Sequence, residues 1–274
     1  MTLDIQLVGN AMQMAVCRLQ PGQVAFCEAG KFLFCSNDIE IETKLSEPTA
    51  PGQPQQAAGQ QGGGGRFGGM LRGAMDAGRR MIAGESFAFQ HFTTRGGDGL
   101  VAFAGTLPGE MQVLELDGTT TWYTEKDAFI AAEAGVHFGI AFSGLRSGMS
   151  GGEGFILEKF TGQGSLLIGG AGNFIEINPA EYGGRLRVDT GCIVAFDHNI
   201  RYGIERVGRF NRQGITNMVF GGEGMSLATL EGNGRVILQS MTIQALAQAL
   251  EKNTGAGDKT TGSGLGGIFT GSSD

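Results

Sequence analysis

The chain has 274 residues, of which 50 are glycine, and a formal net charge of −7 at pH 7. Glycine at more than twice its usual share of about 7%, without a collagen period, is typical of a protein built from many short strands and tight turns. The net negative charge argues against nucleic-acid binding, because binding phosphate groups requires a positive field.

The N-terminal residues 1–6 carry an acid, Asp4, where a secretory signal would carry lysines and then a long apolar block. No apolar stretch of about 18 residues occurs in the sequence, so we expect a cytoplasmic protein without a transmembrane segment. The cysteines show no C-x-x-C spacing, which favours buried reduced thiols over disulfides or a metal site. They are Cys17, Cys27, Cys35 and Cys192.

One recurring unit starts at a proline turn and reaches a corner that begins with an acidic residue and ends with glycine. An apolar strand follows each corner. The corners are Glu28–Gly30, Glu133–Gly135 and Asp189–Gly191, and the strands cover residues 32–35, 137–140 and 192–196. The uneven spacing from proline to corner indicates an old duplication with drift and not an open-ended solenoid.

Two consecutive segments interrupt the strand pattern. Residues 46–66 hold three prolines, five glutamines and a run of four glycines, which predicts a mobile loop. The next segment, Phe67–Ile82, has apolar residues at helical spacing and three arginines largely elsewhere on the wheel. It either contacts a membrane surface or a partner, or packs its Met-rich side on the protein's own β core. We favour core packing, because the glycines of this segment make a free-standing helix too weak.

A Gly-Glu turn recurs three times, at Gly84, Gly152 and Gly222, with spacings of 68 and 70 residues. An apolar run, a glycine-bearing turn and a second apolar run follow each one. The first runs cover residues 89–92, 157–160 and 227–230, and the second runs cover residues 99–103, 164–168 and 234–238. We interpret this pattern as one β-hairpin that occurs three times.

The candidate site residues are the glutamates of these turns, Glu85, Glu153 and Glu223. As equivalent positions they could converge on one binding site. Alternatively, each could tie down its own hairpin by accepting hydrogen bonds from backbone amides or an arginine. We favour the structural role.

Sequence motifs for catalysis are scarce. Asp197-His198-Asn199 could be an acid-oriented histidine of a hydrolase or isomerase, but a hairpin turn is the commoner use of these residue types. The histidines lack metal-ligand spacing, so we expect neither a metal nor another cofactor. The six arginines between Arg185 and Arg212 are interpreted as exposed positions on an alternating-strand sheet.

Near the C-terminus, Ile243, Leu246, Ala247 and Leu250 have helical spacing and predict one short helix. The predicted fold class is all-β: a duplicated short double-stranded β-helix or β-sandwich of repeated hairpins, with this helix at its end. The predicted divisions are a β-rich half at 1–145 that contains the 46–66 insertion, a second half at 146–250, and a flexible tail at 251–274.

Several motifs, taken in order, resemble those of bacterial relatives of the altered-inheritance-of-mitochondria proteins over roughly residues 3–250. They are Gly84–Phe87, Gly152–Phe155, Val188–Gly191, Gly221–Gly224 and Val236–Gln239. The resemblance implies a fold similar to the trp RNA-binding attenuation protein, duplicated in one chain, and assembly into rings, with trimers expected. That family has no established activity and no catalytic residues to carry over, and its mitochondrial members are associated with inner-membrane organisation.

The sequence therefore predicts a non-enzymatic, oligomeric β-rich scaffold or binding protein. We expect a homotrimer, because closing a ring removes the unpaired edges of its sheets. The alternative is a ring that binds a small ligand or RNA, and a hydrolase or isomerase is the least favoured class.

Overall fold

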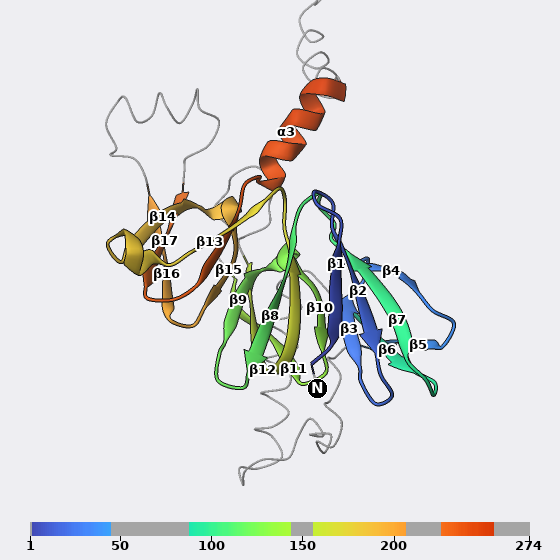
Figure 1. Ribbon diagram of the computed structural model, residues 1–274. Helices are drawn as coiled ribbons and strands as arrows, with labels where there is room; N and C mark the ends of the chain where they lie inside the picture. Colours follow the sequence, from blue (N-terminus) through green and yellow to red (C-terminus); the bar gives the residue numbers. More distant parts are fainter. Residues whose placement is uncertain (1, 45–87, 144–155, 207–225, 255–274) are drawn as a thin grey trace, which may run out of the picture.

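The structure is a computed structural model that describes residues 2–44, 88–143, 156–206 and 226–254. Within these ranges the chain forms antiparallel sheets and one α-helix, α3 (Ile243–Thr254), near the C-terminal end. The predicted all-β class with a single C-terminal helix is confirmed. Figure 1 shows three groups of strands side by side, which we call units 1, 2 and 3 in chain order.

The strands have the following bounds. Unit 1 contains β1 (Asp4–Val8), β2 (Met14–Leu19), β3 (Ala25–Glu28), β4 (Phe32–Cys35), β5 (Ile39–Lys44), β6 (Phe89–Thr94) and β7 (Gly99–Ala104). Unit 2 contains β8 (Met111–Asp117), β9 (Trp122–Glu125), β10 (Phe129–Glu133), β11 (Val136–Ser143) and β12 (Ile156–Gly169). Unit 3 contains β13 (Phe174–Ile177), β14 (Arg185–Asp189), β15 (Ile193–Asp197), β16 (Ile200–Arg206), β17 (Ser226–Gly232) and β18 (Val236–Gln239).

The same strand pairing occurs in all three units. A first sheet has the order β2-β7-β4 in unit 1, β8-β12-β10 in unit 2 and β13-β18-β15 in unit 3. A second sheet has the order β3-β6-β5, β9-β12-β11 and β14-β17-β16. The long strand β12 takes part in both sheets of unit 2, because its first half pairs with β9 and β11 and its second half with β8 and β10.

The predicted hairpin is wrong. The run at residues 89–92 lies in β6, which pairs with β3 and β5, whereas the run at 99–103 lies in β7, which pairs with β2 and β4. The glycine-bearing turn between them therefore connects the two sheets of the unit. In unit 2 this connection is a bend in β12 at Gly162, which has a φ of 98°.

Hairpins are formed instead by the strands on either side of each Gly-Glu segment. Lys44 at the end of β5 pairs with Phe89 at the start of β6. The equivalent pairs are Ser143 with Ile156 and Arg206 with Ser226. The three Gly-Glu segments thus occupy equivalent places in the chain connectivity.

One of the three predicted corners also differs. Glu28–Gly30 and Asp189–Gly191 connect β3 to β4 and β14 to β15, as expected. The equivalent connection in unit 2 is the 3-10 turn Lys126–Ala128 between β9 and β10, capped by Glu125. Glu133–Gly135 leads from β10 into β11 instead, because it lies one strand further along the chain than the corner of this unit.

The predicted boundary between residues 145 and 146 falls between β11 and β12, which pair from Val136 with Gly162 to Ser143 with Ile156. The strand pairing therefore does not follow that boundary. Helix α3 extends to Thr254, into the segment 251–274 that the sequence predicted as a tail. The rest of that tail and the segments 46–66 and 67–82 lie outside the described residues.

Each of the three apolar clusters contains residues from more than one unit. Phe129 of unit 2 packs against Phe160, with ring centroids 4.9 Å apart, and against Phe26 of unit 1, at 5.8 Å. The same cluster reaches Trp122 in unit 2 and Ile237 in unit 3. Aromatic burial across the boundaries between units therefore holds the described strands in a single body.

Candidate functional site

The three glutamates singled out from the sequence, Glu85, Glu153 and Glu223, lie outside the described residues. The described strands place each of them in a segment that joins two paired strands, β5 to β6, β11 to β12 and β16 to β17. Both hypotheses for these glutamates stay predictions.

Asp197 lies in a turn, but not in the hairpin turn that the sequence favoured, because β15 and β16 pair with different strands. One carboxylate oxygen accepts a hydrogen bond from the Asn199 N–H at 2.8 Å, and the other accepts one from the Arg235 N–H at 2.9 Å. The imidazole of His198 accepts a hydrogen bond at Nδ1 from the Thr121 N–H. The acid and the imidazole thus bind different backbone amides in the connections next to β15, β18 and β9, an arrangement that stabilises the turn.

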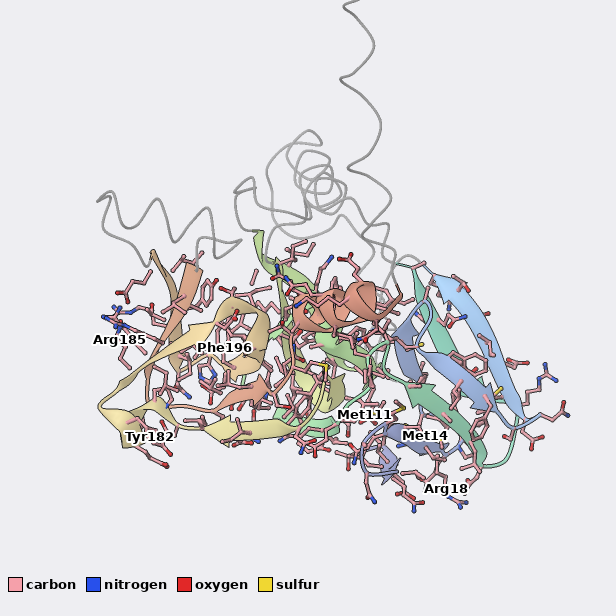
Figure 2. The ribbon with its side chains drawn as sticks, turned by 90° about the horizontal axis from the view of Figure 1, so that it is seen from above. Met14, Arg18, Met111, Tyr182, Arg185 and Phe196 are labelled. Atoms are coloured by element: carbon pink, nitrogen blue, oxygen red, sulfur yellow. The ribbon has the colours of Figure 1, made fainter. Side chains whose placement is uncertain are left out.

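Arg185, Arg187 and Arg201 lie on the exposed face of the second sheet of unit 3, and Figure 2 shows Arg185 at the outer end of the molecule. Glu205 Oε2 is 3.0 Å from Arg185 Nη2 and 3.1 Å from Arg187 Nε. Glu231 pairs with Arg185 and with Arg201, and the hydrogen bond from Arg201 holds the pKa of Glu231 below its usual range. Because carboxylates alternate with these arginines, the face has little net positive field for a phosphate chain.

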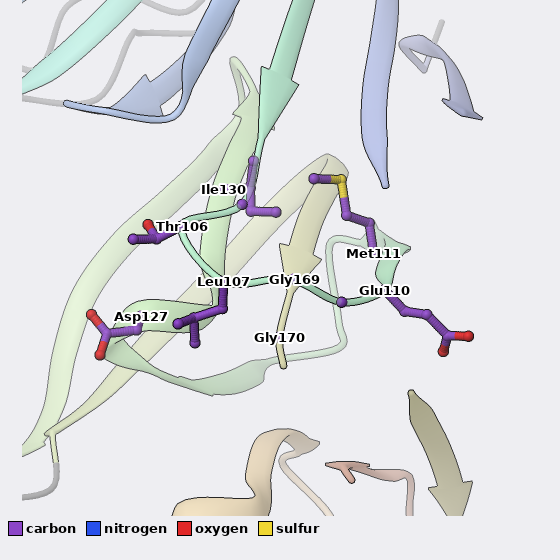
Figure 3. Close-up of a pocket in the computed structure, with 10 residues that line it drawn as sticks. Thr106, Leu107, Glu110, Met111, Asp127, Ile130, Gly169 and Gly170 are labelled. Atoms are coloured by element: carbon purple, nitrogen blue, oxygen red, sulfur yellow. The ribbon is translucent and has the colours of Figure 1, made fainter. Parts of the chain in front are cut away.

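A small pocket lies beside the connection from β7 to β8 (Figure 3). Its walls include Thr106, Leu107, Asp127 and Ile130, and it has room for about one water molecule. Glu110 also belongs to the wall, but its carboxylate accepts a hydrogen bond from the Phe174 N–H at 2.6 Å. The pocket is too small to hold a substrate.

A buried cation, Lys31, links unit 1 to unit 2 next to this pocket. Its Nζ donates to Thr106 Oγ1 at 2.8 Å and to the Asp127 carbonyl at 3.4 Å. The Asp127 N–H in turn donates to Glu125 Oε2 at 2.9 Å. Sequence reasoning missed this contact, although Lys31 follows the Glu28–Gly30 corner directly. The contact joins two equivalent corners and is structural.

Glu125 titrates near neutral pH. Its burial, reinforced by the charge of Asp127, raises the pKa of the Glu125 carboxyl to about 7 from an ordinary value of 4.5. Folded protein therefore holds this proton at pH values where unfolded protein has released it. The contribution of Glu125 to the stability of the fold is therefore complete at pH values below the pKa of Glu125 in the unfolded chain. This contribution is lost as the pH rises through the pKa of Glu125 in the folded protein.

We expect Glu125→Gln to raise the free energy of unfolding by about 1 to 3 kcal/mol at about pH 8, and by much less at about pH 5. Glutamine keeps an acceptor for the Asp127 N–H and carries no charge to desolvate. Denaturant unfolding of wild type and variant at both pH values measures the difference, with the exposed Glu181→Gln as the matched control. An equal increase in the free energy of unfolding at both pH values would contradict the raised pKa of Glu125.

All four cysteines are free, as the sequence predicted, and two of them are fully buried. Burial raises the pKa of the Cys17 and Cys27 thiols to about 12, so both stay protonated at neutral pH and are weak nucleophiles and metal ligands. No group of His, Cys, Asp and Glu side chains within the described ranges is arranged to hold a metal ion.

The feature with the clearest capacity to bind something is the edge strand β4. Leu33 and Phe34 are 48% and 47% exposed, although both are large and apolar. Among the described strands β4 pairs with β7 alone, so no described strand pairs with the N–H and C=O groups on its other side. An apolar edge of this kind is a template for another strand. This exposure could not be predicted from the sequence, because residues 32–35 are as apolar as the buried strand at 193–196.

Comparison with known proteins agrees with the motifs. The family model described as mitochondrial biogenesis AIM24 matches residues 5–241. The chain belongs to the AIM24 family. The AIM24 assignment confirms the resemblance to altered-inheritance-of-mitochondria proteins that the Gly-Glu and strand motifs suggested.

A crystal structure of a Streptococcus pyogenes protein is similar to this AIM24 chain, with a TM-score of 0.65 and 22% identity. The match covers 92% of this chain and 99% of the streptococcal one. At this identity the likeness shows a shared fold alone. No curated protein matches the chain. Helix α3 and the other described helical segments fall short of the length and apolar character that crossing a bilayer requires.

Proposed function

We propose that this AIM24-family protein is a non-enzymatic, oligomeric scaffold or binding protein of the cytoplasm. The observation that carries the proposal is the exposed apolar edge of β4, with Leu33 and Phe34. Self-assembly would cover these side chains and pair the free backbone groups of the edge. The free cysteines support a reducing compartment.

A structural role for the polar clusters supports the non-enzymatic reading. The Asp197 carboxylate is engaged by two backbone amides, and Lys31 holds two corners together. The alternative, a ring that binds a small ligand or RNA, has weaker support. The pocket next to Lys31 has room for about one water molecule, and Arg185, Arg187 and Arg201 are paired with glutamates.

We further propose that the three units are internal repeats and that the assembly is a closed homotrimeric ring. Closed rotational symmetry is the usual way in which soluble proteins remove open interfaces. The common pairing pattern of the units supports the proposal of internal repeats. The open strand edges at the two ends of the row of units support the proposal of a closed ring.

Light scattering of the full chain at micromolar concentration tests this function. We expect a mass three times that of the 28.6 kDa chain. A monomer under these conditions would contradict the scaffold proposal, and a stable assembly of another size would correct the ring number alone.

A further inference from the structure

The units are joined by one kind of strand pair that occurs twice. At the first junction β3 of unit 1 pairs antiparallel with β10 of unit 2, with Cys27 opposite Ala131 and Phe26 opposite Ala132. At the second junction β9 of unit 2 pairs antiparallel with β15 of unit 3. There Thr124 is opposite Ala195, and Tyr123 is opposite Phe196. In both junctions, the strand before the corner of one unit pairs with the strand after the corner of the next unit.

Each junction has the same register relative to its corner. Cys27 and Thr124 directly precede the acidic corner residues Glu28 and Glu125, and they face Ala131 and Ala195. The corner acid of unit 3 is Asp189, so the equivalent residue there is Val188.

Two strands of these types remain without a junction partner. In the part of the chain that the structure describes, β14 of unit 3 pairs only with β17, and β4 of unit 1 pairs only with β7. The two strands lie at opposite ends of the row of units in Figure 1. In Figure 2, Arg185 of β14 is correspondingly far from Met14 and Arg18 of unit 1. They therefore cannot meet within one chain in this arrangement.

A shared irregularity aligns β4 with the junction strands β10 and β15. All three have a register shift against the neighbouring strand in their own first sheet, and the shift passes over Leu33, Ile130 and Val194. A bulge can protect an edge strand from pairing. However, β10 and β15 have the same irregularity and still accept a partner, so it does not prevent β4 from doing so.

The aligned residues differ in burial, as expected if β4 lacks the junction strand that covers β10 and β15. Ile130 and Val194 are each 1% exposed, whereas the aligned Leu33 is 48% exposed. The next aligned residues after the shift are Ala131, Ala195 and Phe34. The two alanines are 3% and 0% exposed, and Phe34 is 47% exposed. The β4 edge thus has apolar side chains like those at the two junctions, but no described strand of a neighbouring unit covers them.

We propose that β4 of one copy pairs antiparallel with β14 of a second copy, as a third junction of the same kind. Its register places Phe34 opposite Val188, and Cys35 opposite Arg187. The proposal rests on the self-assembly proposed above and names the strands that mediate it. The two surfaces differ, so the contact is head-to-tail and repeats from copy to copy until the ring closes.

Cysteine crosslinking of the full chain tests the register. Arg187→Cys places a thiol opposite the native Cys35, and residues directly opposite in an antiparallel pair have Cα atoms about 4.5 to 5.5 Å apart, within disulfide range. After mild oxidation we expect covalent oligomers on a non-reducing gel. They should disappear when Cys35→Ser is added. The control is Ile204→Cys, which is exposed on β16, two strands away from the free edge of β14. It should form no disulfide-linked oligomers and should run as a single chain on the same gel.

A second pair of variants tests the same contact without a disulfide. Phe34→Asp changes a side chain that is exposed in the single chain, so its monomer should keep the wild-type melting temperature. A carboxylate buried at the contact should weaken self-association by about tenfold or more. Ile204→Asp should leave the association unchanged.

The outcomes separate this inference from the proposed function. If wild type assembles but Arg187→Cys gives no Cys35-dependent crosslink and Phe34→Asp assembles normally, the β4–β14 contact is overturned and the scaffold proposal survives. If wild type is a monomer, both are overturned.

Discussion

Phe160→Ala is expected to lower the free energy of unfolding by about 3 to 5 kcal/mol, the usual cost of emptying a large buried aromatic site. Phe160 is fully buried, and its ring centroid lies 4.9 Å from that of Phe129 and 5.6 Å from that of Phe138. Because it lies in β12, which takes part in both sheets of unit 2, the cavity would open at the centre of the molecule. Equilibrium unfolding in denaturant measures the loss.

The matched control is Tyr182→Ala, which removes an aromatic ring that is exposed. Its effect should stay within about 0.5 kcal/mol. A Phe160→Ala variant that is as stable as this control would show that the aromatic cluster around Phe160 does not stabilise unit 2.

Gly162→Ala should cost about 2 to 4 kcal/mol, through backbone strain and a direct clash. Gly162 has a φ of 98°, and an added Cβ would overlap the carbonyl oxygen of Gly135. Relief requires the bend in β12 to open, which would disturb both sheets of unit 2. Thermal and denaturant unfolding of the variant give the magnitude.

Gly139→Ala is the control for this substitution. Gly139 lies in the neighbouring strand β11 and has ordinary strand geometry, and an added Cβ would meet open space. Alanine also reduces the entropy of the unfolded chain, so this variant should be as stable as wild type or slightly more stable. Equal destabilisation by both substitutions would contradict a special role for the bend.

The sequence predicted several of the strands, among them β4, β6 and β7, because apolar runs and glycine turns are local signals. It did not predict which strands pair. The run at 89–92 and the run at 99–103 are separated by a short glycine turn, and this pattern is the same for a hairpin and for a corner between two packed sheets. The choice depends on what lies beside each strand, β3 and β5 in one case and β2 and β4 in the other.

The corner of unit 2 shows a similar limit. The acid-glycine pattern selected Glu133–Gly135, whereas the structural equivalent is Glu125–Ala128, which contains no glycine. Its turn is held by the Glu125 side chain, which accepts a hydrogen bond from the Asp127 N–H, so the acid was the informative residue. The acid-glycine pattern selected the wrong residues because a second acid with a glycine after it, at Glu133–Gly135, lies only a few residues beyond Glu125.

The candidate edge could not be found from the sequence for a different reason. Whether Leu33 and Phe34 are covered does not depend on their own strand, because the aligned Ile130 and Ala131 are equally apolar and are buried. It depends on whether a neighbouring unit is present. Exposure at this site is therefore a property of the position of unit 1 in the row of units.

The two junctions have a consequence for how chains of this kind can change in length. Every unit provides a strand of the β3 type towards the following unit and a strand of the β4 type towards the preceding one. Insertion or loss of one whole unit would therefore leave a chain with the same two kinds of free end. Evolution could alter the number of units per chain without having to rebuild the proposed contact between chains.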